Sequence, residues 1–334
     1  MKITALILLL SAVVASCSGQ SASAKADAAP AERVARPSDA FCSDSAYANV
    51  AAQVAMGPRT PGSDGAARCA RWAAERLHAA GADTVAILPA DATRFDGKKL
   101  RLENVFASFG ADASRRVLLL AHYDTRPWAD MEADAARRMQ PIPGANDGAS
   151  GVGVLLEIAR CLGAAPAKIG VDILLVDGED SGFGDMIAPE GLAEKPDTWC
   201  LGTQAWLASD PYKGRQLPAY AVLLDMVGGA GARFHREQFS DASAARIVDR
   251  IWAEAASLGY ADTFVDRTGG AIVDDHLYVA RAGVPSVDII EHINPATGSF
   301  PPYWHTHADD MDNIDPATLE RVGRTVLSLL YKEK

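Results

Sequence analysis

The sequence predicts a single α/β domain, in which helices cover both faces of a mixed, mostly parallel central sheet. Runs such as Val117–Ala121 and Val171–Val176 are too uniformly apolar for half-exposed strands, which is typical of central strands buried on both faces. Helical patterns such as Gly151–Leu162 separate these runs along the chain. Because strands that alternate with helices usually build a parallel sheet, the order of the patterns indicates the same fold.

The expected elements follow in chain order. The turn residues of Gly57–Gly62 separate two opening helices at Asp44–Ala55 and Asp64–Ala80. Six apolar runs then predict strands at Val85–Leu88, Asn104–Phe109, Val117–Ala121, Val171–Val176, Ala221–Leu224 and Val287–Ile290. Further helical patterns lie at Gly151–Leu162, Gly202–Leu207, Ala242–Leu258, Asp275–Ala282 and Pro316–Tyr331. We therefore expect one globular domain over residues 41–334.

The first 40 residues lack a globular pattern. Lys2 and the apolar run Leu6–Val14 are typical of a secretory signal over residues 1–16, too short to span a bilayer as a mature helix. Cys17 follows a Val-Ala-Ser triplet that resembles a bacterial lipobox, which implies cleavage before Cys17 and its acylation. Ordinary signal-peptidase cleavage is the alternative. Residues 17–40, rich in Ala, Ser and Pro, indicate a flexible tether. The sequence thus predicts an exported bacterial lipoprotein, anchored in a membrane and facing the periplasm or the cell surface.

The net charge and the cysteine pattern argue against two classes of function: nucleic-acid binding and a zinc site made of thiolates. The 334 residues carry a net charge of −11, and loss of the signal with Lys2 makes it more negative. Such an acidic domain is not expected to bind nucleic acid. Four cysteines follow the lipobox; an exported compartment permits disulfides, and Cys42 and Cys69, which flank the first predicted helices, could pair. Because the chain has no Cys-X-X-Cys motif, a thiolate zinc site is not expected.

Polar residues follow several predicted strands at the point where each strand ends. His122 comes directly after Val117–Ala121, and Asp225 directly follows Leu224. Ligands of open α/β sheets bind outside the carboxyl ends of the strands, so these side chains are expected at one site. Asp147 lies in a Gly-rich turn that opens the next helix. It is therefore either a helix cap or a further ligand at that site.

The adjacent acids Glu179 and Asp180 follow another of these strands. Neighbouring carboxylates repel one another unless a cation or a shared proton offsets the repulsion. Zinc can bind one of them while the other, free of the metal, acts as general base or acid. A solvated acidic loop is the alternative, which the apolar run Ile173–Val176 disfavours, because only Asp177 and Gly178 separate it from the pair.

A histidine near the end of the chain completes the candidate ligands. His305 lies between Trp304 and Thr306, at the end of an aromatic and Pro-rich run that begins at Phe300. These flanks indicate a metal ligand at the floor of an apolar pocket rather than an ordinary loop histidine. Asp274 opens a predicted helix, where it either complements the helix dipole or hydrogen-bonds a substrate amine or amide.

In chain order, these motifs resemble the M28, zinc aminopeptidase-like family from about residue 41 to the end. The matching runs are His122–Asp124, Gly144–Gly151, Asp177–Asp180, Leu224–Met226, Asp274–His276 and Trp304–Thr306. Within that family the chain is most similar to zinc-dependent glutaminyl-peptide cyclotransferases, the glutaminyl cyclases. The Asp-Gly-Glu-Asp run, the Trp-Cys-Leu-Gly-Thr-Gln run and the aromatic run before Thr306 carry this closer resemblance.

The resemblance implies one zinc ion held by Asp147, Asp180 and His305, with Glu179 as general base and acid. The implied reaction closes the N-terminal glutamine of a peptide or protein to pyroglutamate and releases ammonia. Asp180 departs from the animal cyclases, which usually have Glu at this position. The shorter side chain keeps the charge but changes the expected geometry of the zinc site.

The same resemblance assigns the remaining site residues. Asp225 and Asp274 would form a hydrogen-bond network near the metal and take part in catalysis. Trp199, Phe300 and Trp304 would wall the substrate pocket. The family also suggests a monomer.

Two other functions compete with this reading. In a two-zinc aminopeptidase, His122 and Asp225 would bind a second ion and Asp147 would bridge the two. The aromatic wall favours the cyclase, because a compact pocket suits a cyclising glutamine. A non-catalytic surface lipoprotein is a further alternative; it is disfavoured because each candidate position carries an acid or an imidazole.

Overall fold

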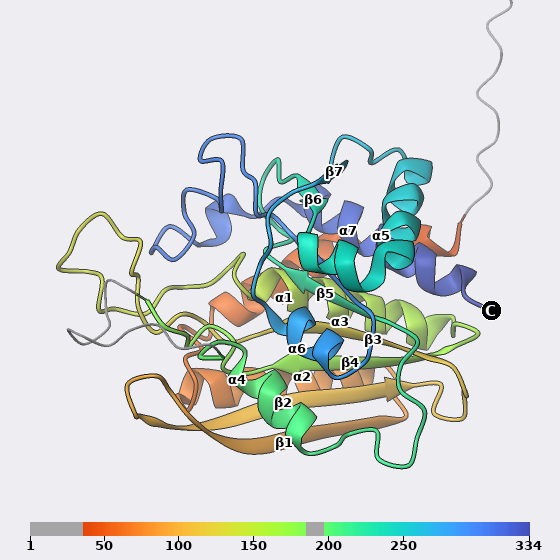
Figure 1. Cartoon of the computed structure of the whole chain (residues 1–334), viewed down its shortest axis with the longest axis horizontal. Helices are drawn as coiled ribbons and strands as arrows, with labels where there is room; N and C mark the ends of the chain where they lie inside the picture. Colours follow the sequence, from red (N-terminus) through yellow and green to blue (C-terminus); the bar gives the residue numbers. More distant parts are fainter. Residues whose placement is uncertain (1–35, 185–196) are drawn as a thin grey trace, which may run out of the picture. The chain divides into compact units, whose positions relative to one another are not determined.

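A six-stranded sheet forms the centre of the domain, with its strands in the order β1-β2-β4-β3-β5-β8 (Figure 1). The computed structural model describes residues 36–184 and 197–334. The strands are β1 (Thr84–Thr93), β2 (Lys99–Phe109), β3 (Arg116–His122), β4 (Gly170–Val176), β5 (Ala221–Asp225) and β8 (Ser286–Ile290). β2 pairs antiparallel with β1 and β4, and the other neighbours are parallel. The predicted mixed, mostly parallel sheet is therefore confirmed.

The four parallel strands β3, β4, β5 and β8 are buried along their whole length. Successive side chains point to opposite faces of a strand. On β3, Leu119 accordingly packs in one apolar cluster, and Leu118 and Leu120 pack in another. Both faces of the sheet are thus covered, as the uniformly apolar runs predict.

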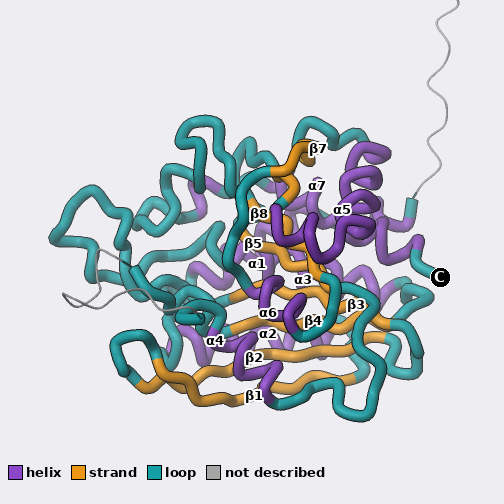
Figure 2. The backbone as a smooth tube through the Cα atoms, in the orientation of Figure 1, coloured by secondary structure: helices purple, strands orange, loops and turns teal. Residues whose placement is uncertain are grey.

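Seven α-helices and two 3-10 helices surround the sheet in the described part of the chain. They are η1 (Pro37–Ala40), α1 (Ser43–Val54), α2 (Asp64–Ala79), α3 (Ala149–Ala164), α4 (Leu201–Ala208), α5 (Gln238–Leu258), α6 (Asp275–Arg281), η2 (Met311–Asn313) and α7 (Pro316–Lys332). The larger apolar cluster joins α1, α2, α3, α5 and α7 to one face, and α4 and α6 cover the other. In Figures 1 and 2, α4 and α6 lie in front of the sheet and α2 and α3 lie behind it.

Each strand and helix expected from the sequence corresponds to an observed element, with ends that differ by a few residues. Two strands were not predicted: β6 (Phe234–Arg236) and β7 (Phe264–Thr268) form a separate parallel pair. Their sequences, Phe-His-Arg and Phe-Val-Asp-Arg-Thr, contain no apolar run like those that mark β5 and β8.

The expected signal and lipobox, including Cys17, lie outside the described residues and stay predictions. Residues 36–40, assigned from the sequence to the tether, belong to the packed domain. Pro37–Ala40 form η1, and Arg36, which precedes it, donates a hydrogen bond to the carbonyl of Ser257 at 3.3 Å. None of the described helices combines the length and apolar character needed to cross a membrane.

The cysteines of the described residues are free thiols. The Cys42–Cys69 pairing, which the sequence left open, is therefore not formed in this structure. Cys42 is exposed at the start of α1, whereas Cys69 is fully buried on the inner side of α2. Although both cysteines lie near the first two helices, the fold keeps their sulfur atoms apart.

Candidate active site

Side chains from distant parts of the sequence meet at the carboxyl ends of the parallel strands. His122 is the last residue of β3 and Asp225 is the last residue of β5. Asp147 precedes α3, which begins at Ala149, and the pair Glu179-Asp180 follows β4, which ends at Val176. The sheet thus places these polar groups on one edge, where open α/β folds bind their ligands.

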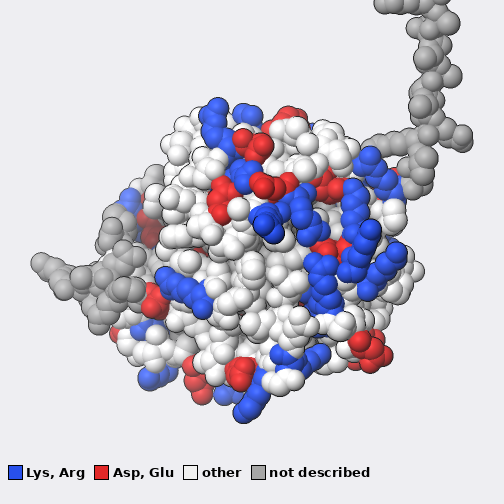
Figure 3. All heavy atoms as spheres, turned by 45° about the vertical axis from the view of Figure 1, so that its right-hand side comes forward, with Lys and Arg blue, Asp and Glu red and all other residues white. Residues whose placement is uncertain are grey.

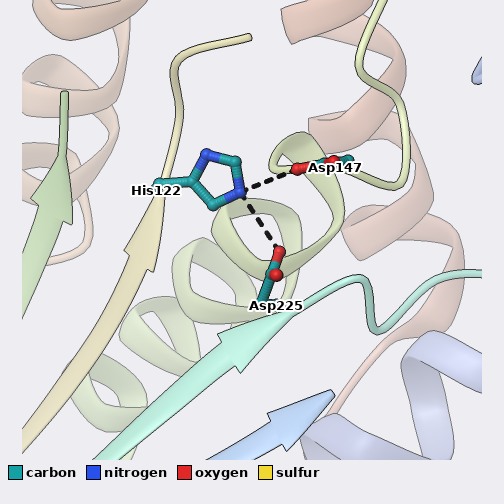
Figure 4. A group of neighbouring side chains, drawn as sticks. All are labelled: His122, Asp147 and Asp225. Atoms are coloured by element: carbon teal, nitrogen blue, oxygen red, sulfur yellow. Dashed lines mark hydrogen bonds and ion pairs between the residues drawn. The ribbon is translucent and has the colours of Figure 1, made fainter. Parts of the chain in front are cut away.

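The first cluster joins His122, Asp147 and Asp225 (Figure 4). The His122 Nε2 atom lies 3.0 Å from Asp147 Oδ1 and 3.1 Å from Asp225 Oδ1. Burial disfavours the charged imidazole, but hydrogen bonds with the surrounding carboxylates outweigh it and raise the pKa of His122 well above its ordinary value. These three residues also have the spacing of a metal-binding group, because their ligand atoms lie within 4.8 Å of one another.

The second cluster joins Asp147, Asp180 and His305, whose ligand atoms also lie within 4.8 Å of one another. The His305 Nε2 atom lies 3.3 Å from Asp180 Oδ1 and 3.7 Å from Asp147 Oδ2. All three side chains are buried, with 1–4% of their surface exposed. Asp147 therefore turns one carboxylate oxygen to each cluster.

The second cluster fits a zinc ion. One imidazole nitrogen and two carboxylates are the kind of ligand set that catalytic zinc uses, leaving a position for water or substrate. Within the described residues, Asp180 Oδ2 is buried without a hydrogen-bond partner, which is costly unless a cation or a proton compensates. Burial accordingly raises the pKa of Asp180 to about 6. Asp147, Asp180 and His305 would hold the ion, and the shorter Asp180 still reaches the cluster.

Glu179 lies beside these ligands but outside the second cluster. Its Oε1 atom accepts a hydrogen bond from the Cys200 thiol at 3.4 Å, and it forms a third close group with Cys200 and Asp274. Burial raises the pKa of Glu179 well above its ordinary value, and that of Asp274 likewise. The site therefore offers a second buried carboxyl next to the candidate zinc ligands, in a position to exchange protons with a bound molecule.

A cavity of about 240 Å³ opens over these groups. Its floor includes Asp147, Asp180 and His305, and its walls include Trp199, Phe300 and Trp304, together with residues 271–273. The ring centroids of Phe300 and Trp304 are 4.4 Å apart. The His305 imidazole stacks at 3.6 Å on Trp304 and is nearly parallel to the Trp199 ring at 6.4 Å. The three rings named from the sequence thus surround one pocket.

Two glycines permit this close packing. A Cβ atom on Gly182 would lie 1.9 Å from the Trp199 ring, and one on Gly148 would lie 2.4 Å from the His122 ring. Both distances are far shorter than any real contact, so a larger residue would displace the ring. Gly182 therefore lets the Trp199 wall of the pocket pack closely, and Gly148 does the same for the His122 ring of the first cluster.

Several supporting residues were not assigned from the sequence. Asp309 accepts hydrogen bonds from the backbone N–H groups of Asn146 at 2.8 Å and Asp147 at 3.1 Å. Asp124 likewise accepts from the N–H groups of Glu179 at 3.1 Å and Asp180 at 3.2 Å. Asp124 could have been identified from its place just after a predicted strand. Asp309, by contrast, lies in an acidic loop whose sequence resembles any solvated turn. The role of Asp309 depends on its contact with Asp147, which lies 162 positions away in the chain.

Two other histidines near the motifs belong to neither the first nor the second cluster, although His276 lies close to Asp274 and Asp288. His307 pairs with Glu132 at 2.8 Å and does not contact the clusters described above. His276 is fully buried behind Asp274 and contacts Glu237 at 3.1 Å. The choice of His305 over its neighbour His307 therefore agrees with the geometry.

Comparison with known proteins places these features in a family. Residues 104–330 match peptidase family M28. The crystal structure of Tannerella forsythia glutaminyl cyclase is 46% identical and superposes with a TM-score of 0.83, covering 88% of this chain and 99% of that one. The resemblance noted from the sequence motifs is therefore confirmed.

Curated relatives are more distant. The glutaminyl-peptide cyclotransferase of Bos taurus is 24% identical over 80% of this chain and 76% of its own length. Aminopeptidase YwaD of Bacillus subtilis is also 24% identical, over 65% of this chain, and this chain spans only 40% of that longer protein. Both activities weighed from the sequence thus occur among the relatives.

Proposed function

The chain belongs to peptidase family M28 and is a zinc-dependent enzyme, and from this premise we propose that it is a glutaminyl-peptide cyclotransferase. Its substrates would be peptides or proteins with an N-terminal glutamine. One observation carries the proposal: the Asp147–Asp180–His305 cluster forms the floor of a small cavity walled by three aromatic rings. Such a pocket suits a single glutamine side chain that folds back on its own amine.

Zinc bound by this cluster would act as a Lewis acid that polarises the γ-amide carbonyl of the substrate. The Glu179 carboxylate accepts a proton from the substrate α-amine, and the amine nitrogen forms a bond with the γ-amide carbon. Glu179 then returns the proton to the amide nitrogen, whose bond to that carbon breaks. Ammonia leaves, and the peptide retains a five-membered pyroglutamyl ring.

This reaction needs no covalent bond to the protein. The amine and the amide belong to one residue, so the pocket has only to hold them close and exclude competing water. Asp225 and Asp274 line the same cavity as Glu179 and would hold the substrate amine. Trp199, Phe300 and Trp304 limit the space around the glutamine side chain.

A two-zinc aminopeptidase is the second candidate, and the first cluster favours it. His122, Asp147 and Asp225 have the spacing of a metal site, and Asp147 offers one oxygen to each cluster. The compact cavity walled by Trp199, Phe300 and Trp304 favours the cyclase instead. The number of zinc ions therefore separates the two proposals.

The test combines two assays with a metal count on the purified protein. Cyclisation predicts ammonia release from Gln-peptides, with one equivalent of zinc. Aminopeptidase activity predicts release of varied N-terminal residues from amino-acid anilides, with two equivalents. Anilide cleavage without ammonia release would refute the cyclase.

We also propose that the chain is exported and anchored through lipid on Cys17. The lipobox-like triplet before Cys17 and the Ala-, Ser- and Pro-rich residues after it support this proposal. Two acyl signals hold a protein at a membrane far better than one. Mass spectrometry of the mature N-terminus would detect acylated Cys17; an unmodified N-terminus at another residue would refute the anchor. Light scattering on the detergent-free domain would test the expected monomer.

A further inference from the structure

Two charged residues beside the candidate zinc ligands have no role in the reaction described above. Arg126 and Asp130 lie in the loop that follows β3, and they expose only 1% and 7% of their surface. Two groups of opposite charge at this depth need close partners, because burial of an isolated charge is costly. Their partners are the residues that build the candidate site.

Asp130 contacts the side of His305 that faces away from the cluster. The Asp130 Oδ1 atom lies 3.0 Å from His305 Nδ1, whereas His305 Nε2 faces Asp147 and Asp180. A carboxylate at Nδ1 holds the proton on that nitrogen and leaves the Nε2 lone pair free for a cation. Asp130 therefore selects both the ring orientation and the tautomer of His305 that metal binding requires.

Arg126 contacts three parts of the site with one guanidinium. It donates to both oxygens of Asp130, at 3.2 and 2.6 Å. Its Nη1 group donates to the backbone carbonyl of Asp180 at 3.1 Å and lies 3.4 Å from the carboxylate of the same residue. The guanidinium carbon also lies 4.6 Å from the centre of the Trp199 ring. The planar fork of Arg makes such simultaneous contacts possible, and Lys could not reproduce them.

We propose that Arg126 and Asp130 are a positioning pair that orients two of the three zinc ligands, Asp180 and His305. The pair also fixes Trp199, so the metal site and the aromatic wall share one support. The inference rests on the zinc ligands of the proposed function, but not on the reaction they catalyse.

A second buried pair, on strands β3 and β4 themselves, provides a matched control. Arg116, at the start of β3, donates to Asp172 of β4 at 2.9 and 2.6 Å, and both side chains are at most 5% exposed. This pair has the same chemistry and a similar burial, but it contacts none of the zinc ligands. The variants Asp130→Asn and Asp172→Asn therefore remove the same charge at the two ends of the sheet.

The experiment measures zinc affinity by competition with a chromophoric chelator. We expect Asp130→Asn to bind zinc about 10–100-fold more weakly than the wild type, which is the usual effect of losing such a partner. Asp172→Asn should lower the melting temperature of the zinc-free protein but leave the zinc affinity within about threefold of wild type. The visible spectrum of the Co²⁺-substituted protein should change in Asp130→Asn alone.

Arg126→Lys gives a second variant in case Asp130→Asn does not fold. It keeps the positive charge but loses the bidentate fork, and it should weaken zinc binding about tenfold. Equal zinc affinity in Asp130→Asn and wild type, or an equal loss in Asp172→Asn, would overturn the positioning pair. A wild type that binds zinc tightly but releases no ammonia would refute the cyclase and leave the pair intact.

Discussion

Strands β3 and β4 hold buried charges at both ends, but the two ends differ in how those charges are partnered. At the amino end of the strands, Arg116 and Asp172 bind each other through two hydrogen bonds, and Asp172 also accepts one from Tyr212 at 3.1 Å. At the carboxyl end, one oxygen each of Asp180 and Asp274 has no hydrogen-bond partner among the described residues. We call the amino end closed, because its buried charges have partners within the protein, and the carboxyl end open, because two of its buried oxygens have none among the described residues.

This difference separates buried charges that maintain the fold from those that bind a ligand. An unpartnered buried polar group costs about 1–3 kcal/mol, and a charged group costs more. The closed pair at the amino end avoids this cost within the protein. The open end can avoid it only with a cation, a substrate or extra protons, and several of its carboxyls have raised pKa values because they are buried. On the face of the molecule that Figure 3 shows, by contrast, Lys and Arg are mixed with Asp and Glu.

The largest effect is expected from Glu179→Gln, at the open end. Loss of the proton acceptor should lower the rate of ammonia release about 10²–10⁴-fold. Zinc content should not change, and the melting temperature should stay equal or rise, because one buried acid is removed. Glu157→Gln is the matched control: Glu157 is also buried, but it pairs with Arg160 on α3, away from the site. Wild-type ammonia release by Glu179→Gln would exclude it as the proton shuttle.

A substitution at the closed, amino end of the strands should lower stability and leave activity unchanged. Asp172→Asn leaves the Arg116 charge buried without its partner, which typically destabilises a protein by about 3–5 kcal/mol. Chemical denaturation should show this loss, while the rate of ammonia release per folded molecule stays at the wild-type value. A drop in that rate without a loss of stability would mean that the two ends are not independent.

Zinc removal should destabilise the protein through the open end alone. A ligand at about 100 times its dissociation constant stabilises the native state by about 2.7 kcal/mol, so a chelator should lower the melting temperature of the wild type. His305→Ala, which removes a proposed ligand, should melt at the same temperature with and without the chelator. If its response equals that of the wild type, zinc stabilises the protein at a different place.

A smaller, pH-dependent effect is expected behind the site, where Glu237 is fully partnered. Burial opposes its ionisation, but hydrogen bonds from His276 and from the backbone N–H groups of Phe239 and Ile272 lower the pKa of Glu237 to about 2. Because the folded pKa lies below the unfolded one, this stabilisation is present at neutral pH and is lost as the pH falls from about 4.5 to about 2.

Glu237→Gln should therefore be less stable than the wild type at pH 7, by about 2 kcal/mol, and the difference should shrink in acid. Urea titrations at pH 7 and pH 3.5 measure it. A constant difference across this range would show that the hydrogen-bonding shape of Glu237, rather than its charge, provides the stability.

Much of the site could be predicted because a strand end has a recognisable sequence. A run of apolar residues that ends at His122, at Asp225 or two residues before Glu179-Asp180 marks the carboxyl edge of a buried strand. Arg126, Asp130 and Asp309 gave no comparable signal, since charged residues in a loop are ordinary at any surface. Their burial and their contacts arise only after the loops pack over the sheet.

The sequence by itself determined the α/β alternation, the burial of the parallel strands and the edge on which the acids collect, because these depend on local periodicity and strand ends. Only the tertiary structure decided which oxygens have partners, that Cys42 and Cys69 stay apart, and that one guanidinium contacts Asp180, Asp130 and Trp199 together. Those properties depend on distances between residues far apart in the chain, and no local pattern contains such distances.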